Sequence, residues 1–242
     1  MSAAALAWQE CLLRAASERW ETTNMRQLRS IVYLPLISLS LGAALAGCDT
    51  DPAKDKTKAT VSEAVLAATP AQPSAASAKY TFSQASSKVE FVGAKITNKH
   101  DGKFGTFNGS IDVVEGKPEK SSVVTEIEMA SVSVDDDRLT GHLKTPDFFN
   151  VAQFPKAKFS STSITPQGIN TSKYQVTGNL ELHGITKSIS FPATIQVAGD
   201  AVDVSAEFAI NRKDFGIVYP GAPDDLIKDD VLLKLSLHAT KN

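Results

Sequence analysis

The sequence predicts an all-β protein, built as an antiparallel sheet of about eight strands that closes into a barrel. From residue 80 onward, apolar and polar side chains alternate with period two in one segment after another, which is typical of strands with one buried face. Short turn-rich segments separate these strands, as antiparallel neighbours require. Closure would bury all the apolar faces together and leave the polar faces in water.

The strands can be followed in chain order by their apolar positions. These positions are Val89, Phe91 and Gly93; Phe107, Gly109, Ile111 and Val113; Val123, Thr125, Ile127 and Met129; Tyr174, Val176, Gly178, Leu180 and Leu182; Ile189, Phe191, Ala193, Ile195 and Val197; Val202, Val204, Ala206, Phe208 and Ile210; Val231, Leu233, Leu235 and Leu237. One short helix is expected in the connection near residues 137–150, because its acidic start suits a helix N-terminus.

Composition sets broad limits on the function. The chain has 242 residues, 42% hydrophobic and 21% charged, which fits a soluble domain with one sizeable core and an appendage. Its formal net charge of −2 gives no reason to expect a nucleic-acid partner. Both cysteines, Cys11 and Cys48, precede the strand-rich region, so we expect no disulfide within it.

The N-terminal region is typical of an exported protein. Residues 25–47 have a basic start and an apolar run that is short for a membrane span, so they predict a signal peptide, and residues 1–24 are interpreted as an upstream artefact. The signal ends in Leu45-Ala46-Gly47-Cys48, which resembles the bacterial lipobox and predicts lipidation of Cys48. The alternative is an ordinary signal peptide followed by a plain thiol, but the small residues before Cys48 favour lipidation.

The segment after the cysteine is interpreted as a tether. Residues 48–79 are rich in Ala, Pro, Ser, Thr and Lys, without an aromatic residue, and are predicted to be a disordered linker with an end-to-end distance on the order of 30 Å. Asp49 resembles the signal that retains lipoproteins at the inner membrane in enteric-type bacteria. We therefore expect a periplasmic lipoprotein anchored to a membrane, with the inner membrane favoured.

Several separated motifs carry a resemblance to a known family. The first consists of Arg138, His142, Leu143, Phe148, Phe149, Pro155, Phe159 and Ser161, and the second of Val176, Gly178, Leu180, His183, Gly184, Thr186 and Lys187. NRKDFG at 211–216 and DDVLLKLSLHA at 229–239 follow in order. This combination resembles the YceI family of lipocalin-like periplasmic proteins over about residues 80–239. The family often has Asp after the aromatic pair, where this chain has Asn150.

The resemblance implies a lipocalin-like barrel whose apolar pore holds a polyisoprenoid or a similar long-chain lipid. Small residues lie in the apolar register of several strands, where they would either leave a lumen or serve close packing, and the resemblance favours a lumen. These small residues are Gly93, Gly109, Gly178, Ala193 and Ala206. The expected lining residues are Phe91, Phe107, Ile111, Leu180, Ile189, Phe191 and Phe208, with Phe148, Phe149 and Phe215 near a mouth.

Two other functions remain open from the sequence. One is an envelope enzyme or metal-dependent protein that uses His100, His142 or His183 with residues 135–137. No pair among these histidines has helical spacing, no cysteine is near, and no GxSxG or phosphate-binding glycine loop occurs, so we expect no enzyme activity, cofactor or metal. The other is a structural or stress-linked module with a filled core.

Overall fold

The computed structural model describes residues 51–65 and 77–242, all of which belong to one compact unit. The predicted upstream stretch 1–24, the signal peptide 25–47, Cys48 and Asp49 lie outside the described residues. No helix within residues 51–65 and 77–242 has the length and hydropathy needed to cross a membrane.

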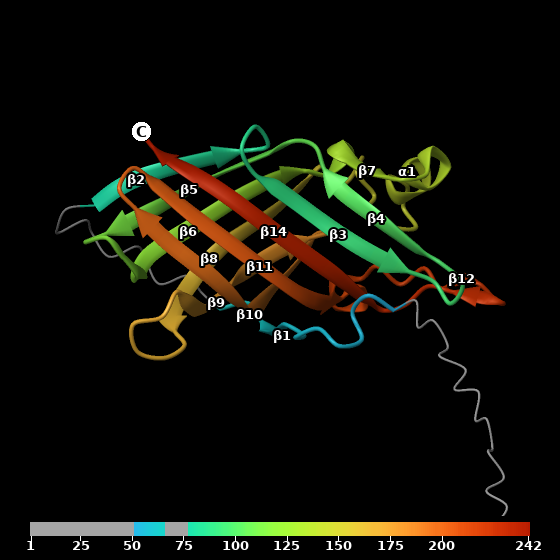
Figure 1. Ribbon diagram of the computed structural model, residues 1–242. Coiled ribbons are helices and arrows are strands. Elements are labelled where there is room, and N and C mark those ends of the chain that lie inside the picture. Colours follow the sequence, from blue (N-terminus) through green and yellow to red (C-terminus); the bar gives the residue numbers. More distant parts are fainter. Residues whose placement is uncertain (1–50, 66–76) are drawn as a thin grey trace, which may run out of the picture. The chain divides into compact units, whose positions relative to one another are not determined.

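The sheet consists of strands that follow one another around the barrel wall (Figure 1). They are β2 (Ser77–Ser83), β3 (Lys88–Ala94), β4 (Lys99–Phe104), β5 (Phe107–Val114), β6 (Lys117–Glu128), β7 (Val132–Val134), β8 (Lys156–Pro166), β9 (Lys173–Leu182), β10 (Ile185–Ala198), β11 (Ala201–Asn211) and β14 (Asp230–Lys241). A short β1 (Thr60–Glu63) lies beside β10.

The ring has eight members, because three pairs of consecutive segments each act as one bent strand. These pairs are β2 with β3, β4 with β5, and β6 with β7. β2 pairs with β5 while β3 pairs with β4, and β6 and β7 continue the same two ladders. β14 pairs with β11 along its length and with both β3 and β2 on its other side, which closes the ring. The prediction of a closed antiparallel barrel of about eight strands is confirmed.

The interior holds the apolar faces that the period-two pattern predicts. Phe191 and Phe208, from β10 and β11, stack near the middle of the barrel with ring centroids 4.1 Å apart and planes 11° apart. Both rings are buried in the main core cluster, which extends from Tyr80 to Ala239. At the end of the barrel that holds the β10–β11 turn, which we call the far end, the Tyr80 hydroxyl donates a hydrogen bond of 2.9 Å to the Gly199 carbonyl.

Aromatic rings from neighbouring strands cover two of the mid-strand glycines. A side chain at Gly178 would place its Cβ 2.5 Å from the Phe159 ring and 2.5 Å from the Ser160 carbonyl oxygen. The Phe82 ring lies over Gly109 in the same way. Because glycine has no side chain, each ring can approach the backbone of the neighbouring strand closely.

Residues 57–63 form part of the barrel wall, which corrects the prediction of a disordered linker over this part of 48–79. β10 pairs with β11 over Thr194–Ala198, and nearer its start β10 pairs instead with β1, from Thr60↔Ser190 to Glu63↔Lys187. Ala209 of β11 bonds through both its N–H and its carbonyl to residues 57 and 59. The segment therefore fills the opening between β10 and β11.

Alternation of inward and outward side chains explains why residues 57–63, although largely polar, can form part of the barrel wall. Ala59 and Val61 pack against the main core, while their neighbours along the chain are exposed. Ion pairs hold the segment at its outer side, where Lys56 pairs with Glu207 at 2.5 Å, Lys58 with Asp230, and Glu63 with Lys187. Strand edges and charges that lie more than 100 residues further along the chain thus determine the structure of this segment.

One end of the barrel carries most of the structure outside the main strands, and we call it the α1 end. Here lie α1 (Asp137–Leu143), η2 (Arg212–Phe215), and the hairpin of β12 (Gly221–Ala222) and β13 (Asp225–Leu226), while η1 (Met129–Ser131) joins β6 to β7 (Figure 1). The Asp136 carboxylate caps α1 by accepting from the Leu139 N–H at 2.7 Å. The predicted short helix near residues 137–150 is therefore confirmed.

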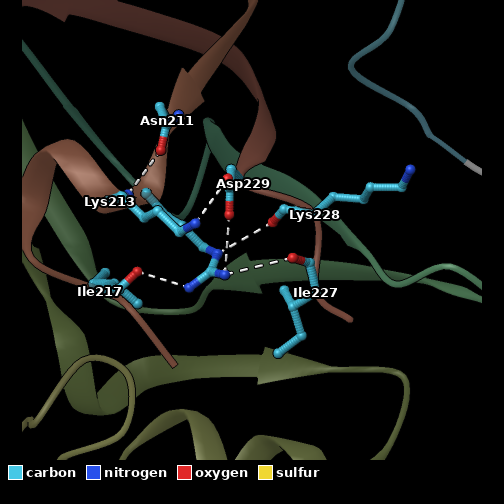
Figure 2. A network of polar contacts seen from close by, with 7 residues as sticks. Asn211, Lys213, Ile217, Ile227, Lys228 and Asp229 are labelled. Atoms are coloured by element: carbon cyan, nitrogen blue, oxygen red, sulfur yellow. Dashed lines mark hydrogen bonds and ion pairs between the residues drawn. The ribbon is translucent and has the colours of Figure 1, made fainter. Parts of the chain in front are cut away.

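Arg212 fastens the loop 217–229 to the α1 end (Figure 2). Its side chain is buried, and it donates to the carbonyls of Ile217 at 2.7 Å and Lys228 at 3.1 Å and to the Asp229 carboxylate at 3.3 Å. Burial lowers the pKa of Arg212 below its ordinary value, and the charge of Asp229 acts in the opposite direction. The guanidinium remains charged and is balanced by these acceptors.

We predict that Val61→Asp destabilises the barrel by about 1–3 kcal/mol, because a carboxylate would replace a side chain that packs against the core. Ser62→Asp is the matched control, since Ser62 is the next residue of the same strand and is exposed. Urea unfolding of both variants measures the difference. Equal stability of the two variants would contradict a role of residues 57–63 in the wall.

We also predict that Arg212→Met lowers the free energy of unfolding by about 3 kcal/mol, because carbonyls around the guanidinium lose their donor. Lys213→Met is the control, because Lys213 also pairs with Asp229, at 2.9 Å, but is exposed and should change stability by less than about 1 kcal/mol. Hydrogen exchange should show faster exchange in 217–229 for Arg212→Met alone. Unchanged exchange there would refute the fastening role.

Candidate functional site

The candidate site is a cavity of about 260 Å³ inside the barrel. It extends from Val204 and Leu237, near the middle of the barrel, to Leu139 and Phe148 at the α1 end. A second cavity of about 10 Å³ lies nearer the far end, beside Val113 and Val202. The larger cavity therefore lies along the barrel interior and reaches the α1 end.

The wall of the larger cavity is almost entirely apolar. Among the described residues that line it, four carry polar side chains: Lys95, His100, Thr125 and Arg212. The apolar lining residues from the strands include Val89, Phe91, Phe104, Ile127, Phe159, Val176, Leu180, Leu182, Ile189, Phe191, Ile195, Phe208, Ile210, Leu233 and Leu235. Such a wall can hold an apolar chain by removing it from water, and it offers few groups that select a polar one.

Most of the lining residues expected from the sequence face this cavity. Five of the expected wall residues and two of the expected mouth residues line it: Phe91, Leu180, Ile189, Phe191, Phe208, Phe148 and Phe149. The strand residues among them point inward because the period-two register of each strand determines which of its side chains face the interior.

Three expected residues lie elsewhere. Phe107 and Phe215 are fully buried in the main core and do not face the cavity, because neighbouring core side chains surround them. Ile111 lines the small second cavity instead, because its position on β5 lies toward the far end of the barrel.

The small residues divide in the same manner. Gly93 lines the cavity, and a Cβ built there would meet no atom within 4 Å. The expectation fails at Gly109 and Gly178, where the Phe82 and Phe159 rings occupy the space. Ala193 and Ala206 are buried within the main core and do not line the cavity. The close-packing alternative thus describes these four positions.

The α1 end of the cavity is bordered by two groups of aromatic rings. Phe104 lies between Phe91, at 5.5 Å between centroids, and Phe149, at 6.0 Å. Phe148 and Tyr219 lie 5.3 Å apart, and the His142 ring contacts both. The loop after α1 and the segment before β12 therefore meet through aromatic contacts over this end of the cavity.

The histidines do not gather at one place. The His100 Nδ1 lies 2.8 Å from the Asp135 carboxylate, and the His142 Nε2 lies 2.8 Å from Asp147. The His183 Nδ1 donates to the Phe215 carbonyl at 3.1 Å. Of the groups considered for an enzyme or metal site, the structure brings together His100 and Asp135. No group of three or more metal-ligating side chains is found in residues 51–65 and 77–242.

The charged lining residues are already paired. Lys95 Nζ lies 2.8 Å from the Asp225 carboxylate, and the pKa of Asp225 is lowered by this hydrogen bond and by those from Thr97. Arg212 is engaged by the carbonyls and the Asp229 carboxylate described above. The charges at the cavity are thus largely balanced within the protein itself, which leaves its interior suited to an uncharged, apolar group.

Sequence reasoning missed several lining residues. Phe159, in the first family motif, and Arg212, in the NRKDFG segment, both line the cavity but are not among the lining residues expected from the sequence. A lone Arg directly after the apolar strand β11 was an available signal, because a charge in such a place needs partners. For Leu143, Ile217 and Ile227, which come from the helix and loops, no period-two pattern exists to follow.

Comparisons with known proteins agree with this architecture. A UPF0312 protein of Pseudomonas putida is 33% identical over 136 residues, which is 54% of this chain and 70% of that protein. A UPF0312 protein of Pseudomonas fluorescens is 32% identical over 139 residues, covering 55% of this chain and 71% of the relative.

Solved structures show the same fold. Burkholderia cenocepacia BcnA matches with a TM-score of 0.59 at 26% identity, covering 65% of this chain and 98% of that one. A polyisoprenoid-binding domain from Saccharophagus degradans matches with a TM-score of 0.55 at 17% identity, covering 68% and 99%. The family model described as the YceI-like domain matches residues 80–239. Because that match spans most of the barrel and well over half of the sequence, the chain belongs to the YceI-like domain family.

Proposed function

We propose that the barrel binds a long-chain apolar ligand, a polyisoprenoid or a similar lipid, and carries or sequesters it at the bacterial cell envelope without catalysing a reaction. The observation that carries this proposal is the apolar cavity that runs along the barrel interior to the α1 end. Each methylene removed from water there contributes roughly 0.8 kcal/mol, so a long chain gains affinity without any specific polar contact.

The cavity size bears on how such a ligand sits. At about 260 Å³ it is slightly smaller than the roughly 300–1,000 Å³ usual for small-molecule sites. A long chain must therefore move ring side chains such as Phe159 or project past the aromatic groups at the α1 end. At the far end only a cavity of about 10 Å³ remains beside the core, and the Tyr80 hydroxyl bonds to the Gly199 carbonyl, so we infer that the polar end of the ligand lies at the α1 end.

Two further observations support binding of a lipid. A domain of the same fold from Saccharophagus degradans is described as polyisoprenoid-binding, which supports the ligand class by likeness of fold. The positions of His100, His142 and His183, each with a separate partner, favour binding over catalysis. For location we propose a periplasmic lipoprotein attached through Cys48, with Asp49 favouring the inner membrane.

The sharpest test uses the two mid-strand glycines that the structure distinguishes. We predict that Gly93→Leu fills open space in the cavity and lowers the lipid recovered with the protein several-fold, while delipidated stability changes by less than about 1 kcal/mol. Gly178→Leu should instead destabilise the barrel by at least about 1–3 kcal/mol, because the Phe159 ring and Ser160 carbonyl would have to move.

Lipid extracts of gently purified protein, analysed by mass spectrometry, measure the first effect, and denaturant unfolding after delipidation measures the second. Glu90→Leu is the control for added apolar volume, because Glu90 lies on the outer face of the strand that carries Gly93. A Gly93→Leu variant with its full lipid complement would contradict a ligand at this position. Unsubstituted protein without any lipid would favour the filled structural module.

A further inference from the structure

Three exposed apolar side chains lie in the segments that form the α1 end. Ile96 follows β3, Val218 precedes β12, and Leu226 ends β13, and they are 52%, 63% and 45% exposed. Each is adjacent in sequence to a residue that lines the cavity, namely Lys95, Ile217 and Ile227. We call Ile96, Val218 and Leu226 the apolar tip, and it lies at the edge of the candidate site.

Hydrogen bonds join the turn after β3, which carries Ile96, to the β12–β13 hairpin, which carries Leu226. The Ile96 N–H donates to the Leu226 carbonyl at 3.2 Å, and the Thr97 N–H and hydroxyl both donate to the Asp225 carboxylate. The Lys95 ammonium pairs with the same carboxylate at 2.8 Å. Ile96 and Leu226 therefore lie together on a surface held by hydrogen bonds, and the adjacent Lys95 and Asp225 neutralise each other.

The start of the described chain lies at this end too. Lys58 pairs with Asp230, at the first residue of β14, and the charge of Asp51 also acts on Lys58, whose pKa is raised chiefly by its hydrogen bond to Asp230. Because residues 57–63 are fixed in the barrel wall, the linker before them is short. Two residues, Asp49 and Thr50, separate Cys48 from Asp51, and the three Cα–Cα steps span at most about 11 Å.

We propose that the apolar tip is a membrane-docking surface that seats the α1 end on a lipid bilayer, so that the ligand passes directly between the bilayer and the cavity. This inference rests on the proposed lipid-binding function. A bilayer fits better than a protein partner, because the area that three side chains can bury is far smaller than the roughly 1,200–2,000 Å² buried in a stable protein interface. Apolar side chains that insert into the headgroup region are sufficient for interfacial binding.

Tryptophan scanning of the processed protein, which begins at Cys48, tests the orientation. Ile96→Trp and Leu226→Trp are compared with Ile169→Trp, which is a matched control because Ile169 is 93% exposed in the β8–β9 turn, away from the α1 end. The proteins are reconstituted on vesicles of phosphatidylethanolamine and phosphatidylglycerol with brominated acyl chains. Trp8 and Trp20 precede Cys48, so the processed chain contains no tryptophan other than the introduced one, and the unsubstituted processed protein provides the baseline. We expect quenching at positions 96 and 226 and none at 169.

A transfer assay tests the consequence for the ligand. The double substitution Ile96→Asp with Leu226→Asp should slow transfer of a fluorescent prenol from these vesicles to the protein about tenfold, because the loss of two inserted side chains weakens docking by more than about 1.4 kcal/mol. Ile169→Asp should transfer at the unsubstituted rate. Equilibrium binding of the same prenol added without vesicles should be equal in all three proteins.

The outcomes separate the two proposals. Unquenched tryptophans at 96 and 226, stronger quenching at 169, or an unchanged transfer rate in the double variant would overturn membrane docking while prenol binding persists. Failure of the unsubstituted protein to bind the prenol at all would instead contradict the proposed function.

Discussion

The structure depends on the closure of the sheet by β14. This strand pairs with β11 from Ala201↔Thr240 to Asn211↔Asp230, and on its other edge with β3 and then β2. Because every strand brings an apolar face, closure gathers these faces into one interior. A ring of eight strands is about wide enough for side chains to fill it or for one small ligand to occupy it. The protein combines the two, with the stacked Phe191 and Phe208 in a packed region beside an open cavity.

The sequence was a good guide wherever structure follows from local alternation. Period two located the strands and placed Phe91 and Leu180 in the wall of the cavity, and the acidic residues before α1 located the helix. The sequence was a poor guide where distant segments of the chain determine the local structure. The ring over Gly178 comes from β8, and the ladder that recruits Val61 belongs to β10. Neither partner can be recognised from the local pattern, because glycine and alanine-rich segments admit several structures.

Residue type alone does not show which polar side chains hold the structure around the cavity. Histidines draw attention by residue type, yet His142 and His183 serve aromatic and backbone contacts at the α1 end. Arg212 is the buried charge at the cavity, and it acts by fixing loop 217–229. Its partners are mostly carbonyls, which no side-chain motif records. Loops and a helix, rather than strands, thus form the α1 end, where we propose that the ligand enters, while at the far end the Tyr80 hydroxyl bonds to the Gly199 carbonyl.

The most direct test of the central claim is a crystal structure of the protein purified gently from the cells that produce it, without added lipid. The account predicts continuous elongated electron density inside the barrel, running from beside Phe148 at the α1 end toward Phe191 and Phe208. It also predicts that the Phe159 ring remains over Gly178 or moves only to widen the cavity. An interior in which these rings turn inward and leave no space or density for a chain would contradict it.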